Sequence, residues 1–240
     1  MKGIGLHQAD LIIPVFNEAE ILETFYRRVS DLGLNLNLIF IDNASSDASV
    51  AIVESFPNAT LIKHEYNGGY GASLIDGMKY GTNDNVIIID ADCEYPPEVI
   101  PEILAALVDH DVVYTSRLYN RRSALDARMP RLKLVGNKII SFLFNTLFRQ
   151  NTTDLYTGCK GFRRQCIKGL TFDRMGFEHV LEFACRISMQ GYRISDIPID
   201  YAQRSTGASK MSHLSETVKF LSLLFYFRFT VRKNIVGARS

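Results

Sequence analysis

The first half of the chain alternates short apolar runs with longer amphipathic stretches. Runs rich in β-branched residues predict strands, and apolar positions spaced three and four apart predict helices. The predicted strands are 11–16, 36–41, 60–64 and 86–89, and the predicted helices between them are 18–32, 46–56 and 70–80. Run 86–89 is entirely apolar, as in a strand buried on both faces. This alternation predicts an α/β fold with a parallel sheet, whose ligands bind beyond the carboxyl ends of the strands.

The second half of the chain is richer in helices. We expect helices at 132–148, 178–190 and 213–227 and a strand at 192–201. Gly191 is placed to end the second helix, and Pro198 indicates an edge strand or a bulge. Helices 132–148 and 213–233 carry apolar stripes with basic flanks, a pattern that fits packing on the core or contact with a membrane surface. With no repeat or linker, residues 1–240 are expected to form a single domain.

Composition narrows the function classes without naming one. Apolar residues make up 47% of the chain and charged residues 22%, and the net charge of +1 gives no indication of a nucleic-acid partner. The four cysteines form no Cys-x-x-Cys pair, which predicts reduced thiols. The N-terminus has no apolar signal-peptide core, and the longest apolar run, 220–227, is shorter than a membrane span. A cytoplasmic protein, peripheral to a membrane at most, is expected.

Two aspartates directly follow the apolar strand 86–89. In an extended segment, Asp90 and Asp92 would project to the same side, where their charges would repel each other. A hard divalent cation such as Mn²⁺ or Mg²⁺, shared with a diphosphate, would offset that repulsion. The alternative is a solvated turn before a helix that starts near Pro96 and Pro97.

Polar residues also follow the other predicted strands. Asn17 and Glu18 could bond a base or ribose, although Asn17 could equally be a helix N-cap. Asp42 could accept a hydrogen bond from a uracil or guanine N–H, with Asp47 ordering the turn. The glycine-rich stretch 67–72 opens a helix, and a helix N-terminus favours phosphate. Its glycine spacing matches neither a Walker motif nor a dinucleotide fingerprint.

Taken together, these motifs resemble a known enzyme family. The series in the first half is Pro14-x-x-Asn17-Glu18, Asp42-x-x-Ser45-x-Asp47, Asn67-x-Gly69-x-Gly71-Ala72 and Asp90-Ala91-Asp92-x-x-x-Pro96-Pro97. The series in the second half includes Ser116-Arg117, Met129-Pro130-Arg131, Gly136-Asn137, Asp154-x-x-x-Gly158 and Arg204-x-x-Gly207-x-Ser209-Lys210. The first series resembles the inverting family 2 glycosyltransferases, and the second resembles their dolichol- or polyprenyl-phosphate mannose synthase branch.

The resemblance implies a type A glycosyltransferase fold and a nucleotide-sugar donor. It implies a donor half at about 8–115, an acceptor half at about 116–212 and an amphipathic C-terminal helix at about 213–233. The donor-binding residues it implies are Pro14, Asn17, Glu18, Asp42, Asn43, Asn67, Gly71, Asp90, Ala91 and Asp92. Asp90, Asp92 and Glu94 would hold Mn²⁺ or Mg²⁺. Two positions depart from the family pattern: Asn43 stands where a second aspartate is usual, and Glu94 where glutamine is frequent.

Two acceptors remain open under this resemblance. A polyprenyl or dolichyl phosphate is already anionic, and Arg117, Arg131 and Asn137 would grip it. A hydroxyl of a glycan or lipid-linked saccharide needs a base, for which Glu178 and Glu182 are the candidates. The residues implied to act in catalysis are Asp92, Arg117, Arg131, Glu182, Arg204 and Lys210, the last two on a loop with Gly207 and Ser209 that closes on the diphosphate.

Partners and donor are specified only in part. The apolar face of the C-terminal helix could meet a membrane surface, a membrane-protein partner or a second copy of the chain. UDP and GDP donors both suit Asp42. A nucleotide-sugar binding protein without transfer activity is the remaining alternative, and the intact Asp90-Ala91-Asp92 motif argues against it.

Overall fold

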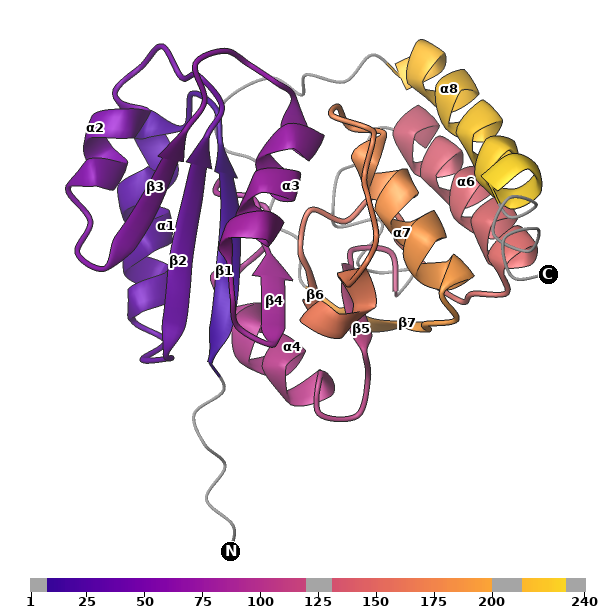
Figure 1. Ribbon diagram of the computed structural model, residues 1–240, viewed down its shortest axis with the longest axis horizontal. Coiled ribbons are helices and arrows are strands. Elements are labelled where there is room, and N and C mark those ends of the chain that lie inside the picture. Colours follow the sequence, from indigo (N-terminus) through magenta and orange to yellow (C-terminus); the bar gives the residue numbers. More distant parts are fainter. Residues whose placement is uncertain (1–7, 120–130, 200–212, 232–240) are drawn as a thin grey trace, which may run out of the picture.

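A single seven-stranded sheet runs through the molecule (Figure 1). The computed structural model describes residues 8–119, 131–199 and 213–231, without the side chains of 131–133 and 213–218. The strand order is β3-β2-β1-β4-β6-β5-β7, and β6 runs antiparallel to both of its neighbours whereas the other pairs are parallel. The strands are β1 (Ala9–Val15), β2 (Leu36–Asp42), β3 (Ala59–Lys63), β4 (Asn85–Ile88), β5 (Val112–Ser116), β6 (Lys160–Arg163) and β7 (Ile194–Pro198).

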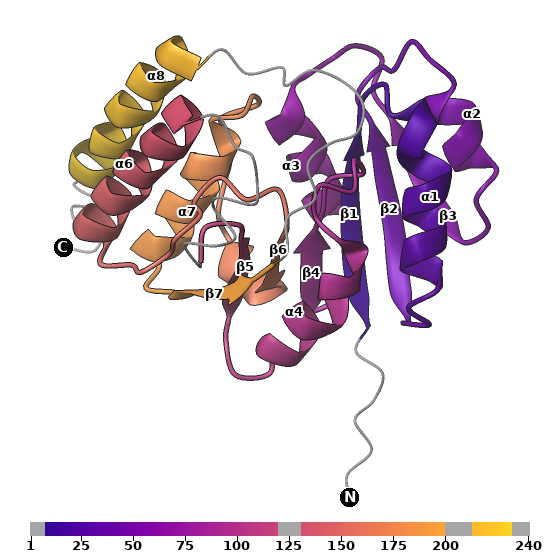
Figure 2. The same ribbon diagram turned by 180° about the vertical axis from the view of Figure 1, so that it is seen from behind.

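Helices cover both faces of the sheet (Figures 1 and 2). Helices α1 (Ala19–Ser30), α2 (Ser49–Glu54) and α4 (Ile100–Ala106) pack on one face. Helices α3 (Tyr70–Tyr80) and α7 (His179–Met189) pack on the other, with α6 (Arg131–Phe148) and α8 (His213–Phe225) beside α7. The short helices are η1 (Pro97–Val99), η2 (Arg164–Ile167) and the π-helical η3 (Tyr226–Val231).

Two apolar cores result from the strand alternation. Ile12 and Ile88 face the core beneath α3 and α7, whereas Leu11, Ile13 and Ile87 face the core beneath α1 and α4. Successive side chains on a strand point to opposite faces, so a strand between two cores needs apolar residues at nearly every position. This is why the central strands read as continuous apolar runs in the sequence.

The predicted elements of the first half are confirmed within three residues at each end. The α/β class is also confirmed, although antiparallel β6 makes the sheet mixed. Strands β5 and β6 were not predicted, whereas η1 begins at Pro97 and leads into α4, close to the helix start that Pro96 and Pro97 suggested. The sequence of β6, Lys-Gly-Phe-Arg, has no β-type pattern, and only its pairing with β4 and β5 makes it a strand. Gly191, at φ 95°, follows α7 as expected, and Pro198 lies on an edge strand.

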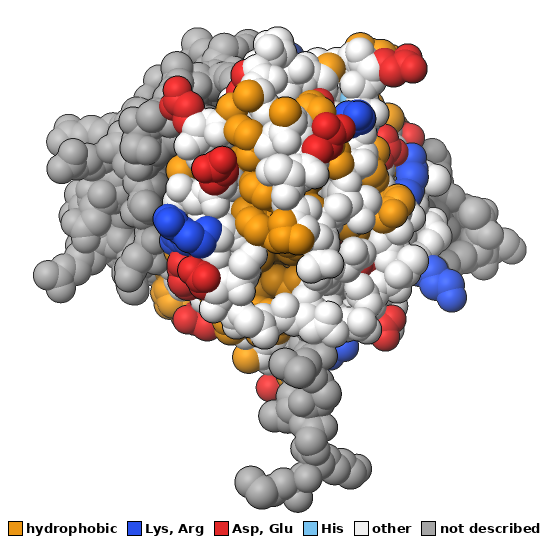
Figure 3. All heavy atoms as spheres, turned by 90° about the vertical axis from the view of Figure 1, so that its left-hand side faces the viewer, with side chains coloured by type: hydrophobic (Ala, Val, Ile, Leu, Met, Phe, Trp, Pro, Cys, Tyr) orange, Lys and Arg blue, Asp and Glu red, His pale blue; other side chains and the backbone are white. Residues whose placement is uncertain are grey.

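The β3 edge of the sheet is remote from the centre of the fold. Figure 3 views that side of the molecule and shows a band of hydrophobic side chains with charged groups on both sides. On β3, Leu61 and Ile62 are only partly buried, as expected for an outer strand. The carboxyl ends of β1, β2 and β4, in the interior of the sheet, are therefore the place to look for chemistry.

Two further predictions can be compared with the described residues. Cys93, Cys159, Cys166 and Cys185 are all free thiols, as expected. No helix in the described ranges is both long enough and apolar enough to span a membrane.

A buried carboxylate joins the start of the sheet to the second half of the chain. Asp10 of β1 is inaccessible to solvent, and its Oδ1 accepts hydrogen bonds from the side-chain amides of Asn37 and Asn83, both at 2.8 Å. Its Oδ2 accepts from Arg164 Nη2 at 2.6 Å and from the Asn83 backbone N–H at 2.9 Å. Asp10 thereby satisfies polar groups of β2, the β4 entry loop and η2 together.

We expect Asp10→Ala to lower the free energy of unfolding by about 3 kcal/mol, because it leaves a cation and two amides without their buried partner. Urea denaturation measures the loss. Glu54→Ala is the matched control, since it breaks only the exposed Lys63–Glu54 pair and should cost less than about 1 kcal/mol. Equal effects of the two substitutions would contradict a stabilising role for the Asp10 network.

Candidate active site

Two carboxylates lie just beyond the carboxyl end of β4. The chain turns at Ala91 and Asp92, so the two aspartates do not lie on the extended segment that the sequence suggested. Asp90 Oδ1 accepts a hydrogen bond from the Tyr70 hydroxyl at 2.8 Å. Asp90 Oδ2 lies against Gly158 of the facing segment, where a Cβ would overlap with it. Only glycine at position 158 leaves room for this carboxylate.

The charges of the two aspartates act on each other. Burial, and then the negative charge of Asp92, raise the pKa of Asp90 to about 7. Such a pair is stabilised by a cation, and carboxylate oxygens suit a hard divalent ion. Asp92 Oδ1 accepts the Glu94 backbone N–H at 3.0 Å. Among the described residues no three carboxylate, histidine or cysteine side chains gather as a ready metal site. The predicted trio with Glu94 is therefore not preformed, and the aspartate pair fits an ion that takes its other ligands from a substrate.

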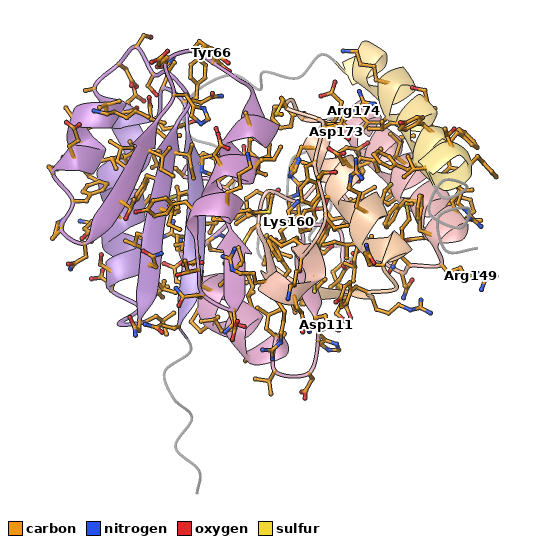
Figure 4. The ribbon with its side chains drawn as sticks, viewed as in Figure 1. Tyr66, Asp111, Arg149, Lys160, Asp173 and Arg174 are labelled. Atoms are coloured by element: carbon orange, nitrogen blue, oxygen red, sulfur yellow. The ribbon has the colours of Figure 1, made fainter. Side chains whose placement is uncertain are left out.

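A buried lysine, missed from the sequence, faces this pair. Lys160 of β6 is 1% exposed and lies opposite Ile88 of β4, at the junction of the two halves of the chain (Figure 4). The charges of Lys160 and Asp90 act on each other, since each shifts the pKa of the other group. Its ammonium lies 4.9 Å from the Tyr114 ring centroid, and no carboxylate of the described chain comes within ion-pair distance.

Two opposing effects act on the pKa of the Lys160 ammonium. Burial lowers its pKa to about 8, and the charge of Asp90 acts in the opposite direction. The aspartates thus have a fixed cation near them before any ion binds. In the sequence, the signal was a lysine inside the otherwise small and apolar stretch 158–162.

Hydrogen bonds join the loop after β1 to the loop after β2. Asn17, at φ 56°, accepts the Ser46 N–H with its side chain at 2.8 Å, so it is not the N-cap of α1. Asp47 accepts the N–H groups of Ala19 at 3.1 Å and Ser49 at 2.9 Å, which confirms its predicted role in ordering the turn. These contacts hold the two loops together next to Asp42.

Asp42 retains an unused acceptor. Its side chain is buried, and Oδ2 accepts the Ser45 N–H at 3.1 Å. Oδ1 is also buried and has no hydrogen-bond partner in the described chain. A buried acceptor left without a donor is costly, so the position suits a ligand N–H.

Asn43 and Asn67, both predicted to contact the donor, bond each other in this structure. Asn43 Nδ2 donates to Asn67 Oδ1 at 2.9 Å, and Asn43 Oδ1 accepts the Gly68 N–H at 2.9 Å. Asn67 Oδ1 also accepts the Gly69 N–H at 3.0 Å. Their amides therefore hold the loop between β3 and α3. A second aspartate in place of Asn43 could not make the bond to Asn67, because it lacks the donor.

The N-terminus of α3 is covered by the second half of the chain. The Ala72 N–H donates to Met175 O at 3.1 Å, and a Cβ on Gly71 would overlap with Arg174 O. The glycines thus allow the loop 171–177 to approach α3. The expectation that these glycines also let α3 approach a phosphate stays a prediction.

Arg117 and Asn137 converge on Asp154. Arg117 Nε and Nη2 donate to the two carboxylate oxygens of Asp154 at 2.6 and 2.9 Å, and Asn137 Nδ2 donates to Oδ1 at 2.9 Å. All three side chains are buried. Burial acts to raise the pKa of Asp154, but the charge and hydrogen bonds of Arg117 outweigh it and the pKa is lowered. In this structure Arg117 and Asn137 thus bond Asp154, and their contact with an acceptor phosphate stays a prediction.

The two candidate bases differ sharply. Glu182 of α7 is inaccessible to solvent, and its oxygens accept the backbone N–H groups of Asp173 at 3.1 Å and Arg174 at 2.8 Å, and Arg186 Nε at 2.8 Å. In this structure the Glu182 oxygens hold the loop before α7, and its role in catalysis stays a prediction. Glu178 precedes α7 and is only partly buried.

The remaining predicted residues are located as follows. Pro14 lies in β1, Glu18 precedes α1, and Ala91 is buried in the turn between the aspartates. Arg131 is the first residue of α6, but its side chain lies outside the described residues. Arg204, Gly207, Ser209 and Lys210 also lie outside them.

Comparison with known proteins identifies the class that this fold and site define. The model of the family "Glycosyl transferase family 2" matches residues 10–171. The chain belongs to this family and is a glycosyltransferase.

Relatives within the family narrow the comparison. The chain is 28% identical over 220 residues to an undecaprenyl-phosphate mannosyltransferase of Micrococcus luteus, covering 84% of this chain and 86% of that protein. It is 23% identical over 212 residues to a dolichol-phosphate mannosyltransferase of Pyrococcus furiosus, covering 85% of this chain and 59% of that longer protein. The resemblance to polyprenyl-phosphate sugar transferases is thereby confirmed.

The type A fold is confirmed by solved structures. Glucosyl-3-phosphoglycerate synthase from Mycobacterium tuberculosis, in a complex with Mn²⁺, UDP-glucose and phosphoglyceric acid, superimposes with a TM-score of 0.67 at 16% identity. The match covers 93% of this chain and 80% of that chain.

A buried histidine makes the fold sensitive to acid. His179 begins α7 and is 1% exposed, and its Nδ1 lies 4.0 Å from Glu182 Oε2. Burial, with the Lys160 charge as a second cause, lowers its pKa from 6.5 to about 3. Between these pH values the unfolded chain takes up a proton that the folded chain does not, so stability is present above pH 6.5 and is lost as the pH falls.

We expect His179→Leu to reduce the dependence of unfolding free energy on pH between about 6.5 and 4, by up to about 1.4 kcal/mol per pH unit. Chemical denaturation across that range measures the slope. His110→Leu is the control at an exposed histidine and should leave the slope unchanged. Equal slopes for wild type and His179→Leu would show that His179 already takes up its proton in the folded state.

Proposed function

We propose that this glycosyltransferase transfers a sugar, with inversion, from a UDP- or GDP-linked donor to a polyprenyl phosphate. The observation that carries the donor half of the proposal is the Asp90–Asp92 pair at the carboxyl edge of β4, beside buried Lys160. Asp42, with its unused Oδ1, lies at the carboxyl end of β2, which β1 separates from β4, and is suited to a base N–H.

The aspartate pair and Lys160 would act on the donor diphosphate. A bound Mn²⁺ or Mg²⁺ would offset the charge that develops on the departing nucleoside diphosphate. Asp90 and Asp92 are the residues of this chain that would hold it. The homologous fold has been solved with Mn²⁺ and UDP-glucose in glucosyl-3-phosphoglycerate synthase, which supports the same class of donor and ion here.

Acceptor chemistry favours a phosphate over a hydroxyl. A phosphate is ionised at neutral pH and needs only positioning, whereas a hydroxyl needs a base. Hydrogen bonds from the Asp173 and Arg174 backbone and from Arg186 engage both oxygens of Glu182, which supports an acceptor that needs no base from this residue. The similarity to undecaprenyl-phosphate and dolichol-phosphate mannosyltransferases supports the same choice. Arg131, Arg204 and Lys210 remain the proposed cationic contacts of the acceptor and diphosphate.

Asp92→Asn should reduce transfer at least about 100-fold, because it removes one of the two charges proposed to hold the ion. The assay offers labelled UDP- and GDP-sugars in turn, with Mn²⁺ and undecaprenyl or dolichyl phosphate, and counts label in the organic phase. Asp109→Asn, at an exposed aspartate between α4 and β5, is the matched control and should keep wild-type activity.

The outcomes of this assay are distinct. Transfer that survives both Asp92→Asn and a chelator would rule out the proposed ion. Absence of lipid label together with metal-dependent release of UDP or GDP would move the acceptor to a hydroxyl. Glu178→Gln would then be the variant that loses activity, since Glu178 is the other candidate base.

A lipid-borne acceptor requires access to a membrane surface. The packed pair α6 and α8, extended by η3, exposes aromatic and aliphatic side chains between basic ones. The exposed apolar residues are Val135, Ile139, Phe142, Phe225, Tyr226 and Phe229, and the basic residues among them are Lys138, Lys219 and Arg228. Val135, Ile139 and Phe142 are spaced to share one side of α6, the geometry of an interfacial helix. We place the protein at a membrane surface through this helix pair, in contact with lipid and not spanning it.

Replacing Phe142 and Phe229 together by Ser should lower binding to vesicles that contain anionic lipid by about tenfold or more, because the variant lacks two exposed rings that would be buried in the lipid. Co-sedimentation measures the bound fraction. Tyr66→Ser with Tyr80→Ser is the control, because these rings are equally exposed but lie in the first half of the chain. Equal vesicle binding by all three proteins would contradict the proposed membrane face.

A further inference from the structure

Tyr70 connects the aspartate pair to the loop that leads into α7. It is the first residue of α3, and its hydroxyl donates to Asp90 Oδ1 at 2.8 Å. Its ring is stacked on Phe177, with centroids 5.1 Å apart and an interplanar angle of 5°. Phe177 immediately precedes Glu178 and α7, so one side chain contacts both the first and the second half of the chain.

The loop that carries Phe177 is held from its far side by charge. Glu182 accepts the N–H groups of Asp173 and Arg174, and Arg186 bonds both Glu182 and Asp173, the latter at 2.7 Å. Asp173 and Arg174 are labelled in Figure 4, on the chain just before α7. A carboxylate that accepts several backbone N–H groups fixes a loop firmly.

The same loop is held from its near side by α3. Ala72 N–H donates to Met175 O at 3.1 Å, and Gly69 and Gly71 leave no space for a Cβ against Met175 and Arg174. Phe177 is therefore fixed relative to Tyr70 by backbone contacts as well as by the stacked rings. A displacement of this loop would move the Tyr70 ring or break its stack.

Among the described residues, Tyr70 and Gly158 make the close contacts that orient the Asp90 carboxylate. Tyr70 binds Oδ1, and Gly158 lies against Oδ2. Gly158 limits where the carboxylate can lie but offers it no hydrogen bond from a side chain. The direction of the remaining lone pairs thus depends on the Tyr70 hydroxyl.

We propose that Tyr70 is a positioning residue that sets the orientation of Asp90 for its cation, and that Phe177 fixes Tyr70 through the ring stack. This inference rests on the proposed function, because Asp90 must hold an ion for its orientation to matter. Through the contacts of Phe177 with Tyr70 and of Tyr70 with Asp90, the loop before α7 would act on the donor site. A change in that loop then changes the affinity for the ion.

The test measures Mn²⁺ binding by electron paramagnetic resonance, with saturating UDP and separately with GDP, for Tyr70→Phe, Phe177→Leu and the double variant. Tyr70→Phe should raise the Kd for Mn²⁺ about tenfold, the usual size of one hydrogen bond to a charged group. Phe177→Leu should raise it by a smaller factor. The double variant should bind no more weakly than Tyr70→Phe, because both changes act through one hydroxyl.

The chain provides a matched control pair on the opposite face of the sheet. Tyr26 is also stacked on a phenylalanine, Phe56, at 4.1 Å and 10°, and its hydroxyl also donates a hydrogen bond, to Pro57 O at 2.7 Å. Tyr26→Phe and Phe56→Leu should leave Mn²⁺ binding unchanged. Thermal unfolding of all variants separates loss of affinity from loss of fold.

Sugar transfer provides a second readout. Tyr70→Phe should raise the Mn²⁺ concentration needed for half-maximal rate, while the rate at saturating Mn²⁺ stays within about threefold of wild type. Unchanged Mn²⁺ affinity in Tyr70→Phe, or additive effects of the two substitutions, would overturn the inference while the proposed function stands. A wild-type protein that binds no Mn²⁺ with either nucleotide would overturn both.

Discussion

Repulsion between two neighbouring carboxylates governs the centre of this molecule. Asp90 and Asp92 follow β4 within a single turn, both are partly buried, and the charge of Asp92 raises the pKa of Asp90. Three groups accommodate these charges. The Tyr70 hydroxyl donates a hydrogen bond to Asp90, Gly158 leaves room for its carboxylate, and the buried Lys160 ammonium supplies a positive charge. Each comes from a different element, so the sheet order that sets β4 beside β6 is what assembles the site.

In this structure, buried ion pairs hold segments of the second half of the chain in position. Arg117 and Asn137 are both directed at Asp154, and Glu182 is occupied by a loop and by Arg186. Removing one partner of such a pair leaves an uncompensated buried charge, which is strongly destabilising. These residues can therefore be essential for activity without touching a substrate. Loss of function on mutation would not by itself distinguish the two roles.

The sequence predicted those features that depend on local pattern. Central strands such as 86–89 are apolar because both faces are buried, and Asp42 and Asp90 follow strands whose carboxyl ends must meet. The burial of Glu182 could not be predicted, because its helix-start position is equally typical of an exposed acid. Lys160 was missed for a related reason: only pairing with β4, more than 60 residues earlier, places it near Asp90.

The saturation of Glu182 also bears on the choice of acceptor. In a site for a hydroxyl acceptor, a carboxylate must keep a lone pair directed at the incoming proton. Here Glu182, the one glutamate of α7, has its oxygens directed at backbone N–H groups, and the loop it holds supports Phe177 and, through it, Tyr70. Glu182 thus positions a loop in this structure, which is compatible with an acceptor that is already ionised and needs no base. Glu178, at the start of the same helix, is the residue on which that argument can be tested.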